Sequence, residues 1–334
     1  MINPIRFIFI SLLLSKMSLS ISERTMLCVV FMRFSDEWAI EYLKSNIGYA
    51  GDYCTSWALM PYLPVTPAMT TMIESFNQSL LDHAALHHTK VMYLLDNSQI
   101  DPQKQGVLHK GCLYTHLLPY LPSYNRVWLL DEDFTLEGFN FMEYFGYWDY
   151  PGGLLQHTMI TQGLVRGRID HVFLSYTFPL WASQRTNSST HLVAFPTNFI
   201  EVQAPILDAA YFKWFLINIQ IPAITTLATT KLDRCHDHGF PYTWCHAAKE
   251  YLIEKGHNSD HNMTCMVIAG SSYTTHNDRK TMGKGKDRLA FNKEGDRVRL
   301  LYQALYPDIY ALKREYVKDR RKWIYPKDFI SSSV

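Results

Sequence analysis

Apolar segments bounded by polar residues recur along the chain and predict buried β-strands. Residues 26–32, Met-Leu-Cys-Val-Val-Phe-Met, are apolar without interruption, as expected of a strand covered on both faces. Five more segments have the composition of strands: 90–95, 126–130, 153–156, 199–202 and 265–269. The segments between them predict helices over 38–43, 113–118, 209–219 and 244–253. Strands that alternate with helices predict an α/β fold with a mainly parallel sheet flanked by helices.

The composition divides the chain into three parts. Residues 26–283 contain all the predicted strands and are expected to form a single α/β domain. From Lys284 onward the chain is rich in charge and poor in β-branched runs, which predicts a charged helical C-terminal extension over 284–334. Residues 1–25 precede the first strand and form a separate leader.

The leader has the layout of a secretory signal or a signal-anchor. Arg6 precedes the apolar run 7–14, and Lys16 follows it. The run is too short to span a bilayer by itself, so any membrane attachment through the N-terminus would be weak. We therefore expect the secretory pathway, with a disordered leader on a cytoplasmic protein as the alternative. Sequons at Asn77, Asn187 and Asn262 are compatible with glycosylation in the secretory lumen.

The overall charge excludes some classes of partner. Lys and Arg number 32 and Asp and Glu number 31, which gives a formal net charge of +1. No global field therefore attracts the chain to nucleic acid. No run of 18 or more apolar residues follows the N-terminus, which excludes a polytopic membrane protein.

Three consecutive acidic residues end one of the predicted strands. Asp131, Glu132 and Asp133 directly follow the apolar segment 126–130. Ligands of open α/β sheets bind outside the carboxyl ends of the strands. Because side chains alternate along an extended chain, Asp131 and Asp133 would point to one side and could share Mn²⁺ or Mg²⁺. The same acids could instead cap a helix and lie at the surface.

A second cluster combines cysteine and histidine. Residues 235–238, Cys-His-Asp-His, precede Cys245 and His246. These side chains are enough for a tetrahedral zinc site, although their spacing matches no standard zinc finger. In an oxidising compartment a Cys235–Cys245 disulfide is the simpler expectation, and free thiols are a third one.

Several blocks of residues, taken in order, resemble one known family. The blocks are 127–134 (Val-Trp-Leu-Leu-Asp-Glu-Asp-Phe) with 139–140 and Tyr144, His109-Lys110 with 117–119, 153–158, 199–205, and His276 with 281–283. Their order over residues 88–283 resembles the family catalogued as domain of unknown function 707. Members of that family look like glycosyltransferases of the nucleotide-diphospho-sugar (GT-A) fold, so the resemblance implies a GT-A-like domain.

The resemblance implies roles for five residues. Asp131 and Asp133 would bind a metal ion and the diphosphate of a nucleotide-sugar donor, and Gln156 would contact the same donor. His276 would complete the metal site from a C-terminal loop, and its imidazole suits Mn²⁺ better than Mg²⁺. Glu201 would bind the acceptor or act as general base. The alternative for Glu201 is a carboxylate that only orients the backbone by bonding its amides.

The chain departs from the family pattern at one acid. The family carries Gly-x-Asp before its late helix, where this chain has Gly239-Phe240-Pro241. Asp237 could replace that acid as the catalytic base if the loop is rearranged. Asp278 is the neighbouring alternative to His276.

Three functions follow from these observations. The leading hypothesis is a metal-dependent glycosyltransferase that uses a nucleotide-sugar donor and a glycan, protein or small-molecule acceptor. Pro241 favours the alternative, a non-catalytic GT-A-like protein that binds carbohydrate or nucleotide. A metal-assisted phosphohydrolase would also use paired acids, but that chemistry usually needs further His and Asp clusters.

Overall fold

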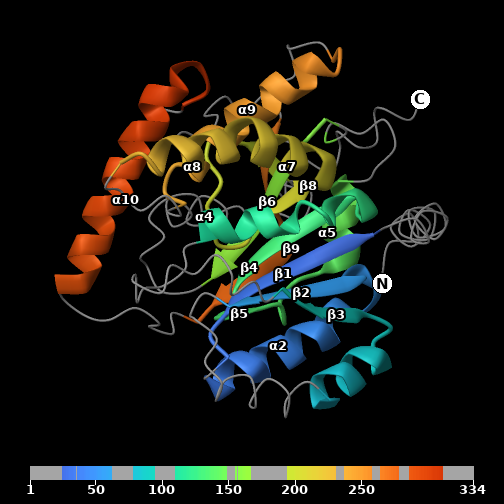
Figure 1. Ribbon diagram of the computed structural model, residues 1–334. Coiled ribbons are helices and arrows are strands. Elements are labelled where there is room, and N and C mark those ends of the chain that lie inside the picture. Colours follow the sequence, from blue (N-terminus) through green and yellow to red (C-terminus); the bar gives the residue numbers. More distant parts are fainter. Residues whose placement is uncertain are drawn as a thin grey trace, which may run out of the picture.

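A nine-stranded sheet runs through the middle of the molecule (Figure 1). The computed structural model describes residues 25–34, 36–61, 78–94, 110–148, 155, 157–166, 194–230, 237–257, 264–277 and 286–310. The strands are β1 (Met26–Met32), β2 (Ser56–Pro61), β3 (Lys90–Tyr93), β4 (Arg126–Asp131), β5 (Phe134–Thr135), β6 (Ile160–Arg166), β7 (Ala194–Pro196), β8 (Ile206–Asp208) and β9 (Cys265–His276). Their order is β3-β2-β1-β4-β8-β6-β9-β5, and β7 pairs with β9.

Most of the described strands run in one direction. β1 is parallel to β2 and β4, β2 is parallel to β3, and β6 is parallel to β9. β8 is antiparallel to both β4 and β6, so β6 and β9 run the same way as β4. The carboxyl ends of β1, β2, β4, β6 and β9 therefore lie at one edge of the sheet. The predicted α/β fold with a mainly parallel, helix-flanked sheet is confirmed.

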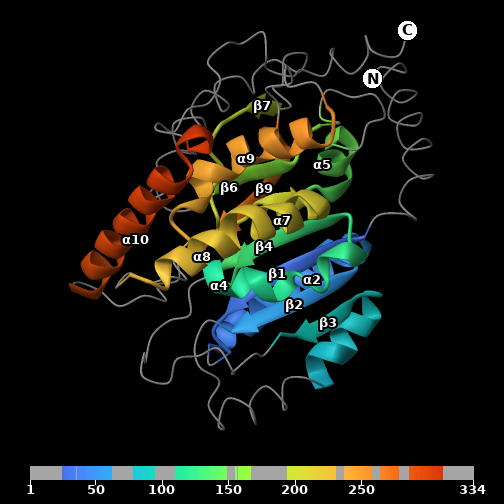
Figure 2. The ribbon, with the colours of Figure 1, turned by 45° about the horizontal axis from the view of Figure 1, so that its top comes forward.

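One face of the sheet carries the larger helical layer (Figures 1 and 2). Its helices are α4 (Lys110–Leu113) with the 3₁₀ turn η3 (Tyr114–Leu117), α7 (Ala209–Phe215), the π-helix η5 (Leu216–Gln220), α8 (Ile221–Leu227), α9 (Phe240–Glu254) and α10 (Lys286–Leu305). Leu27, Val29 and Phe31 of β1 belong to the core on this face, together with aromatic residues of α7 and α9.

The opposite face carries a smaller layer. It contains α2 (Glu37–Ala50), α5 (Phe141–Trp148) and a helix over 78–86. Cys28 and Val30 of β1 pack here with Trp57 of β2, so β1 is buried on both faces as its uninterrupted apolar run predicts. Short 3₁₀ turns are η2 (Gly51–Tyr53), η4 (Leu121–Ser123) and η6 (Pro307–Ile309). Of the helices in the described residues, none has the length and apolar character needed to cross a membrane.

Two of the predicted elements differ from the structure in type. Residues 199–202 form no strand; they lie in an irregular segment between β7 and β8. Side chains, not a neighbouring strand, provide hydrogen-bond partners for the backbone of Phe199 and Ile200. Thr197 Oγ1 accepts from Phe199 N (3.1 Å), and Trp244 Nε1 donates to Ile200 O (3.0 Å). The helix expected over 113–118 is a 3₁₀ turn that continues the short α4.

Some expectations lie outside the described residues. They are the leader up to residue 24, the three sequons, Gln156, Cys235, His236 and Asp278. The short strand expected over 153–156 falls there too, except for Leu155. The fold does not test the predictions that rest on these residues alone.

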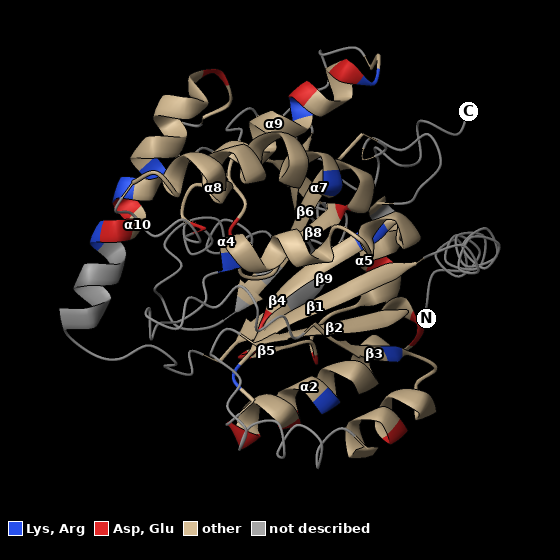
Figure 3. Cartoon of the chain, in the orientation of Figure 1, with Lys and Arg blue, Asp and Glu red and all other residues tan. Residues whose placement is uncertain are grey.

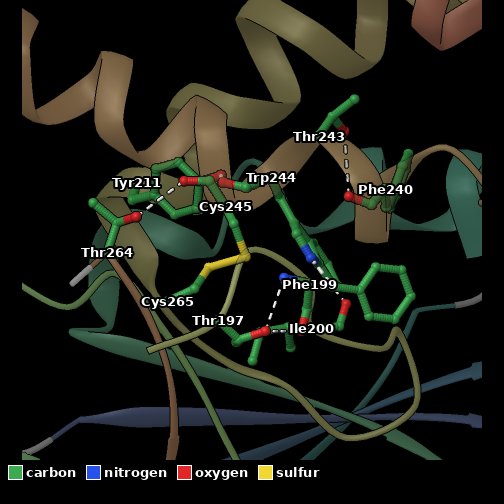
Figure 4. Close-up of a disulfide and its surroundings, with 10 residues drawn as sticks. All are labelled: Thr197, Phe199, Ile200, Tyr211, Phe240, Thr243, Trp244, Cys245, Thr264 and Cys265. Carbon is green, nitrogen blue, oxygen red and sulfur yellow. Dashed lines mark hydrogen bonds between the residues drawn. A yellow bond between two sulfur atoms is a disulfide. The ribbon is translucent and has the colours of Figure 1, made fainter. Parts of the chain in front are cut away.

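The predicted Cys235–Cys245 disulfide is wrong. Cys245 in the second turn of α9 is bonded to Cys265 at the start of β9, with 5.5 Å between their Cα atoms (Figure 4). Thr264 Oγ1 also donates to Cys245 O, at 3.0 Å. The helix and the strand are thus joined by contacts between residues that are distant in sequence. Because Cys245 is in a disulfide, it is neither a zinc ligand nor a free thiol. A second disulfide joins Cys28 to Cys54.

The C-terminal helix α10 packs on the domain through buried residues that include Val298 and Tyr302. Tyr302 is fully buried, and its hydroxyl donates to Gln220 Oε1 at 2.5 Å. Its ring also lies against Gly239, where a Cβ atom would come within 2.4 Å of two ring carbons. Glycine is therefore required at residue 239 by the close approach of the tyrosine ring.

We expect Gly239→Ala to destabilise the protein by about 1–3 kcal/mol, because the added methyl group overlaps a buried ring that has no room to move. Urea unfolding of the variant and the wild type measures the difference. Gly48→Ala is the matched control, since its Cβ would be 3.6 Å from its nearest neighbour and alanine favours the interior of α2. Equal losses in both variants would contradict the steric argument.

Candidate functional site

Asp131 lies at the carboxyl end of β4 and is held by a lysine from the helical layer. It pairs in register with Phe31, which belongs to the core on the α4 side. Lys110 Nζ, from the first residue of α4, donates a hydrogen bond to Asp131 Oδ1 and forms an ion pair with it. Figure 3 shows basic and acidic segments close together where α4 meets the end of β4. The two side chains are 18% and 23% exposed, so a ligand could reach them.

The electrostatics of this pair involve three carboxylates. Burial by itself would lower the pKa of Lys110, but the carboxylates of Asp131, Asp237 and Asp133 outweigh it and raise that pKa above its ordinary value. Burial raises the pKa of Asp131, and the charge of Asp133 adds to this, while Lys110 and His276 oppose it. Lys110 therefore stays protonated and places a positive charge among these carboxylates.

Asp133 contacts a different partner. Its Oδ2 lies 3.1 Å from His276 Nε2, and both side chains are about nine-tenths buried. Pairing of β5 with the end of β9 brings Phe134 opposite His276. Asn277 donates from both its backbone and its side chain to Asp133 O, each at 2.9 Å. The backbone on both sides of the contact is thus fixed by hydrogen bonds.

Glu132, between the two aspartates, supports the fold. It is 5% exposed, and its Oε2 accepts a hydrogen bond from the backbone N–H of Arg33, just after β1. Asn46 of α2 adds two bonds to the same turn, donating to Phe134 O at 2.8 Å and accepting from Leu136 N at 2.9 Å. These bonds tie the end of β4 to β1 and to α2.

The donor set fits a divalent cation in part. Around an octahedral cation with ligands at about 2.1 Å, neighbouring ligand atoms lie about 3 Å apart, close to the spacing of Asp133 Oδ2 and His276 Nε2. A carboxylate and an imidazole together suit Mn²⁺. The third predicted ligand, Asp131, is turned to Lys110 instead. Within the described residues no group of three or more His, Cys, Asp or Glu side chains forms a metal cluster.

The segment that carries Glu201 runs beside the end of β4. Asp131 N donates to Gln203 O at 3.2 Å, and Leu129 N donates to Pro205 O at 3.0 Å. Glu201 is partly buried and lies two residues before Gln203. The structure therefore brings Glu201 to the same edge of the sheet as Asp131.

Asp237 approaches the site from the start of α9. Its backbone carbonyl accepts from Phe240 N at 3.0 Å, and the residue is 7% exposed. Its carboxylate acts electrostatically on Lys110 and Tyr114, and it contributes after burial to the raised pKa of Tyr114. Asp237 is thus near the Lys110–Asp131 pair, whereas Pro241 is buried in the first turn of α9.

Sequence reasoning assigned no role to three residues around the pair. Lys110 was part of the family resemblance, but nothing local in the sequence indicates its contact with Asp131. Tyr114 follows one turn later, and its buried hydroxyl has no hydrogen-bond partner. Gln220, fully buried in η5, donates to Gly111 O at 3.0 Å and so ties α4 to η5.

Comparisons with known proteins give remote similarity only. No family model and no curated protein matches the chain. Glucosyl-3-phosphoglycerate synthase from Mycobacterium tuberculosis with phosphoglyceric acid is similar over 84% of this chain and 80% of that chain, with 12% identity and a TM-score of 0.39. The same synthase with Mn²⁺, uridine diphosphate and phosphoglyceric acid gives 84% and 79% coverage, 10% identity and 0.40. The roles of individual residues therefore rest on the contacts described above.

Proposed function

We propose that the chain is a metal-dependent glycosyltransferase with a GT-A-like domain, which takes a sugar from a nucleotide-sugar donor. The observation that carries the proposal is the contact of Asp133 with His276 beside the Lys110–Asp131 pair. These groups lie at the carboxyl edge of the parallel strands, where α/β proteins bind their ligands. The position of the acids in the order of the family blocks supports the same function.

Asp133 and His276 would hold the cation, with Asp131 as a further ligand once it leaves Lys110. A bound Mn²⁺ or Mg²⁺ would neutralise charge that develops on the departing nucleoside diphosphate. The chain's own contribution is positioning: Asn277 and the β5–β9 pairing fix the Asp133 backbone, and Glu132 fixes the turn between the two aspartates. Such preorganised groups lower the barrier because they need little rearrangement during the reaction.

The acceptor hydroxyl needs a general base, and two carboxylates are candidates. Glu201 lies in the segment that pairs with the end of β4, and Asp237 lies close enough to Lys110 to affect its pKa. A base must come within about 3 Å of the proton's oxygen, directly or through one water molecule. We propose Glu201 as the base and Asp237 as its alternative.

A non-catalytic protein that binds carbohydrate or nucleotide is the second candidate. The observation that favours it is Pro241, which is buried at the start of α9 where the family carries an acid. The side chain of a proline can neither bind a metal ion nor accept a proton. Donor binding without sugar transfer would support this second function.

We expect Asp133→Asn to abolish the Mn²⁺-dependent rise in melting temperature caused by uridine diphosphate, because the neutral amide is a poor ligand for the cation. In the wild type, ligand at 100 times its Kd stabilises the native state by about 2.7 kcal/mol. Thermal shift with and without Mn²⁺ measures the effect over a panel of nucleoside diphosphates. Asp52→Asn, an exposed acid in η2, is the control and should respond like the wild type. An undiminished response in Asp133→Asn would remove this residue from the site.

We expect Glu201→Gln to keep donor binding while sugar transfer slows by about 10²–10⁴-fold, because the amide cannot accept the acceptor's proton. Single-turnover transfer and nucleotide binding are measured on the same preparations, with Asp237→Asn beside it. If only Asp237→Asn slows transfer, Asp237 is the base. Tight donor binding by the wild type without transfer, over a broad acceptor panel, would establish the non-catalytic alternative.

We also propose that the chain enters the secretory pathway. Cys28, Cys54, Cys112, Cys245 and Cys265, the cysteines in the described residues, are all disulfide-bonded, as expected in an oxidising compartment. The leader and the sequons support the same location. Protein made in secretory cells should therefore lose mass on glycosidase treatment and show a Cys245–Cys265 peptide in a non-reducing digest. Unmodified chains with reduced cysteines in the cytosol would contradict this proposal.

A further inference from the structure

We infer that Lys110 is an exchangeable counter-ion: it holds Asp131 while no cation is bound, and it transfers to a phosphate oxygen of the donor when Asp131 turns to the cation. The inference rests on the proposed function and assigns Lys110 a role within it. The occupant of the site is a nucleoside diphosphate with a divalent cation. Lys110 would contact the ligand directly once the exchange has taken place.

The first support is the division of the acidic site between two partners. Asp133 meets His276 with the spacing of two neighbouring ligands, but Asp131 is occupied by the Lys110 ammonium group. A cation at Asp133 and His276 gains a second carboxylate only if Asp131 breaks its bond with Lys110. The lysine therefore competes with the cation for one of its ligands.

The second support is the charge around the lysine. Lys110 interacts with Asp131, Asp133 and Asp237, so these four groups have a formal charge of −2 (three negative, one positive), with His276 counted as neutral. A cluster of this charge attracts a divalent cation but repels a diphosphate. Both a cation and a free ammonium group are needed before the diphosphate can bind.

The third support is the way the lysine is held. Gln220 of η5 donates to Gly111 O at 3.0 Å, so the backbone next to Lys110 is held against η5. The ammonium group lies 5.4 Å from the Phe31 ring centroid, and the Tyr114 hydroxyl, one turn further along, is buried without a partner. Because the backbone is held and the lysine side chain is long and flexible, the ammonium group can exchange partners without a change of fold.

The exchange predicts that cation and nucleotide help each other to bind. A cation alone must displace Lys110 from Asp131, whereas a cation with a diphosphate gives the displaced ammonium group a new partner. The affinity for each ligand should therefore rise when the other is present, by the same factor in both directions.

The test compares Lys110→Met with the wild type and with Lys90→Met, which removes an equal charge from an exposed residue of β3. Free Mn²⁺ is titrated by electron paramagnetic resonance with and without uridine diphosphate. Without nucleotide, Lys110→Met should bind Mn²⁺ about tenfold more tightly than either control, because the competing charged hydrogen bond is gone. Its affinity should also respond less to uridine diphosphate. Unchanged or weaker Mn²⁺ binding in Lys110→Met would overturn the exchange.

A measurement on the wild type covers the case in which the variant does not fold. Lys110 and Lys90 are acylated in the same sample by a limiting amine reagent and quantified by mass spectrometry. Saturating Mn²⁺ should speed acylation of Lys110 several-fold relative to Lys90, and added uridine diphosphate should reverse the effect. A rate of Lys110 acylation that does not change with Mn²⁺ would overturn the inference. If uridine diphosphate and all other nucleotides fail to bind, the proposed function fails, while the Mn²⁺ titration still decides whether Lys110 competes for Asp131.

Discussion

The burial of β4 on both faces and along both edges is the constraint on which the rest of the structure depends. β4 is hydrogen-bonded to β1 on one side and to β8 on the other. Val127 and Leu129 face the larger helical layer, and Trp128 and Leu130 face the smaller one. No position within the strand can hold a charge without a large desolvation cost. The acids therefore lie at the carboxyl end of the strand. Other strands that run in the same direction also end there.

The three acids at the carboxyl end of β4 have different partners and different roles. Asp131 is bound by a lysine from one helical layer, Glu132 by a backbone amide after β1, and Asp133 by a histidine at the end of β9. Simple alternation along an extended chain predicts only that the first and third share a side. The turn that follows β4 and the pairing of β5 with β9 give each acid its own surroundings.

The parts of the fold that are encoded locally could be predicted from the sequence. β1 has the predicted bounds, and β4 ends one residue beyond its apolar run, because uninterrupted apolar segments specify strands buried on both faces. β7 and β8 have three residues each, too few for a periodic signal. The partner of Cys245 and the contacts of Lys110 depend on how distant segments come together. Asp131, Asp133 and His276 could be named as candidates from residue type and order, but the sequence does not show which of them touch.

The hydrogen bonds that run from Tyr302 through Gln220 to Gly111 have a consequence for synthesis of the protein. Tyr302 lies in α10, the last long helix of the described residues, whereas Gly111 lies at the end of the first third of the sequence. The ribosome therefore synthesises every described strand of the sheet before it synthesises Tyr302, which completes these hydrogen bonds. The growing chain can assemble its sheet early, but the helix that carries Lys110 gains its full set of bonds only when α10 has emerged. A nascent chain would thus hold the acids of the site well before it could hold its lysine firmly in place.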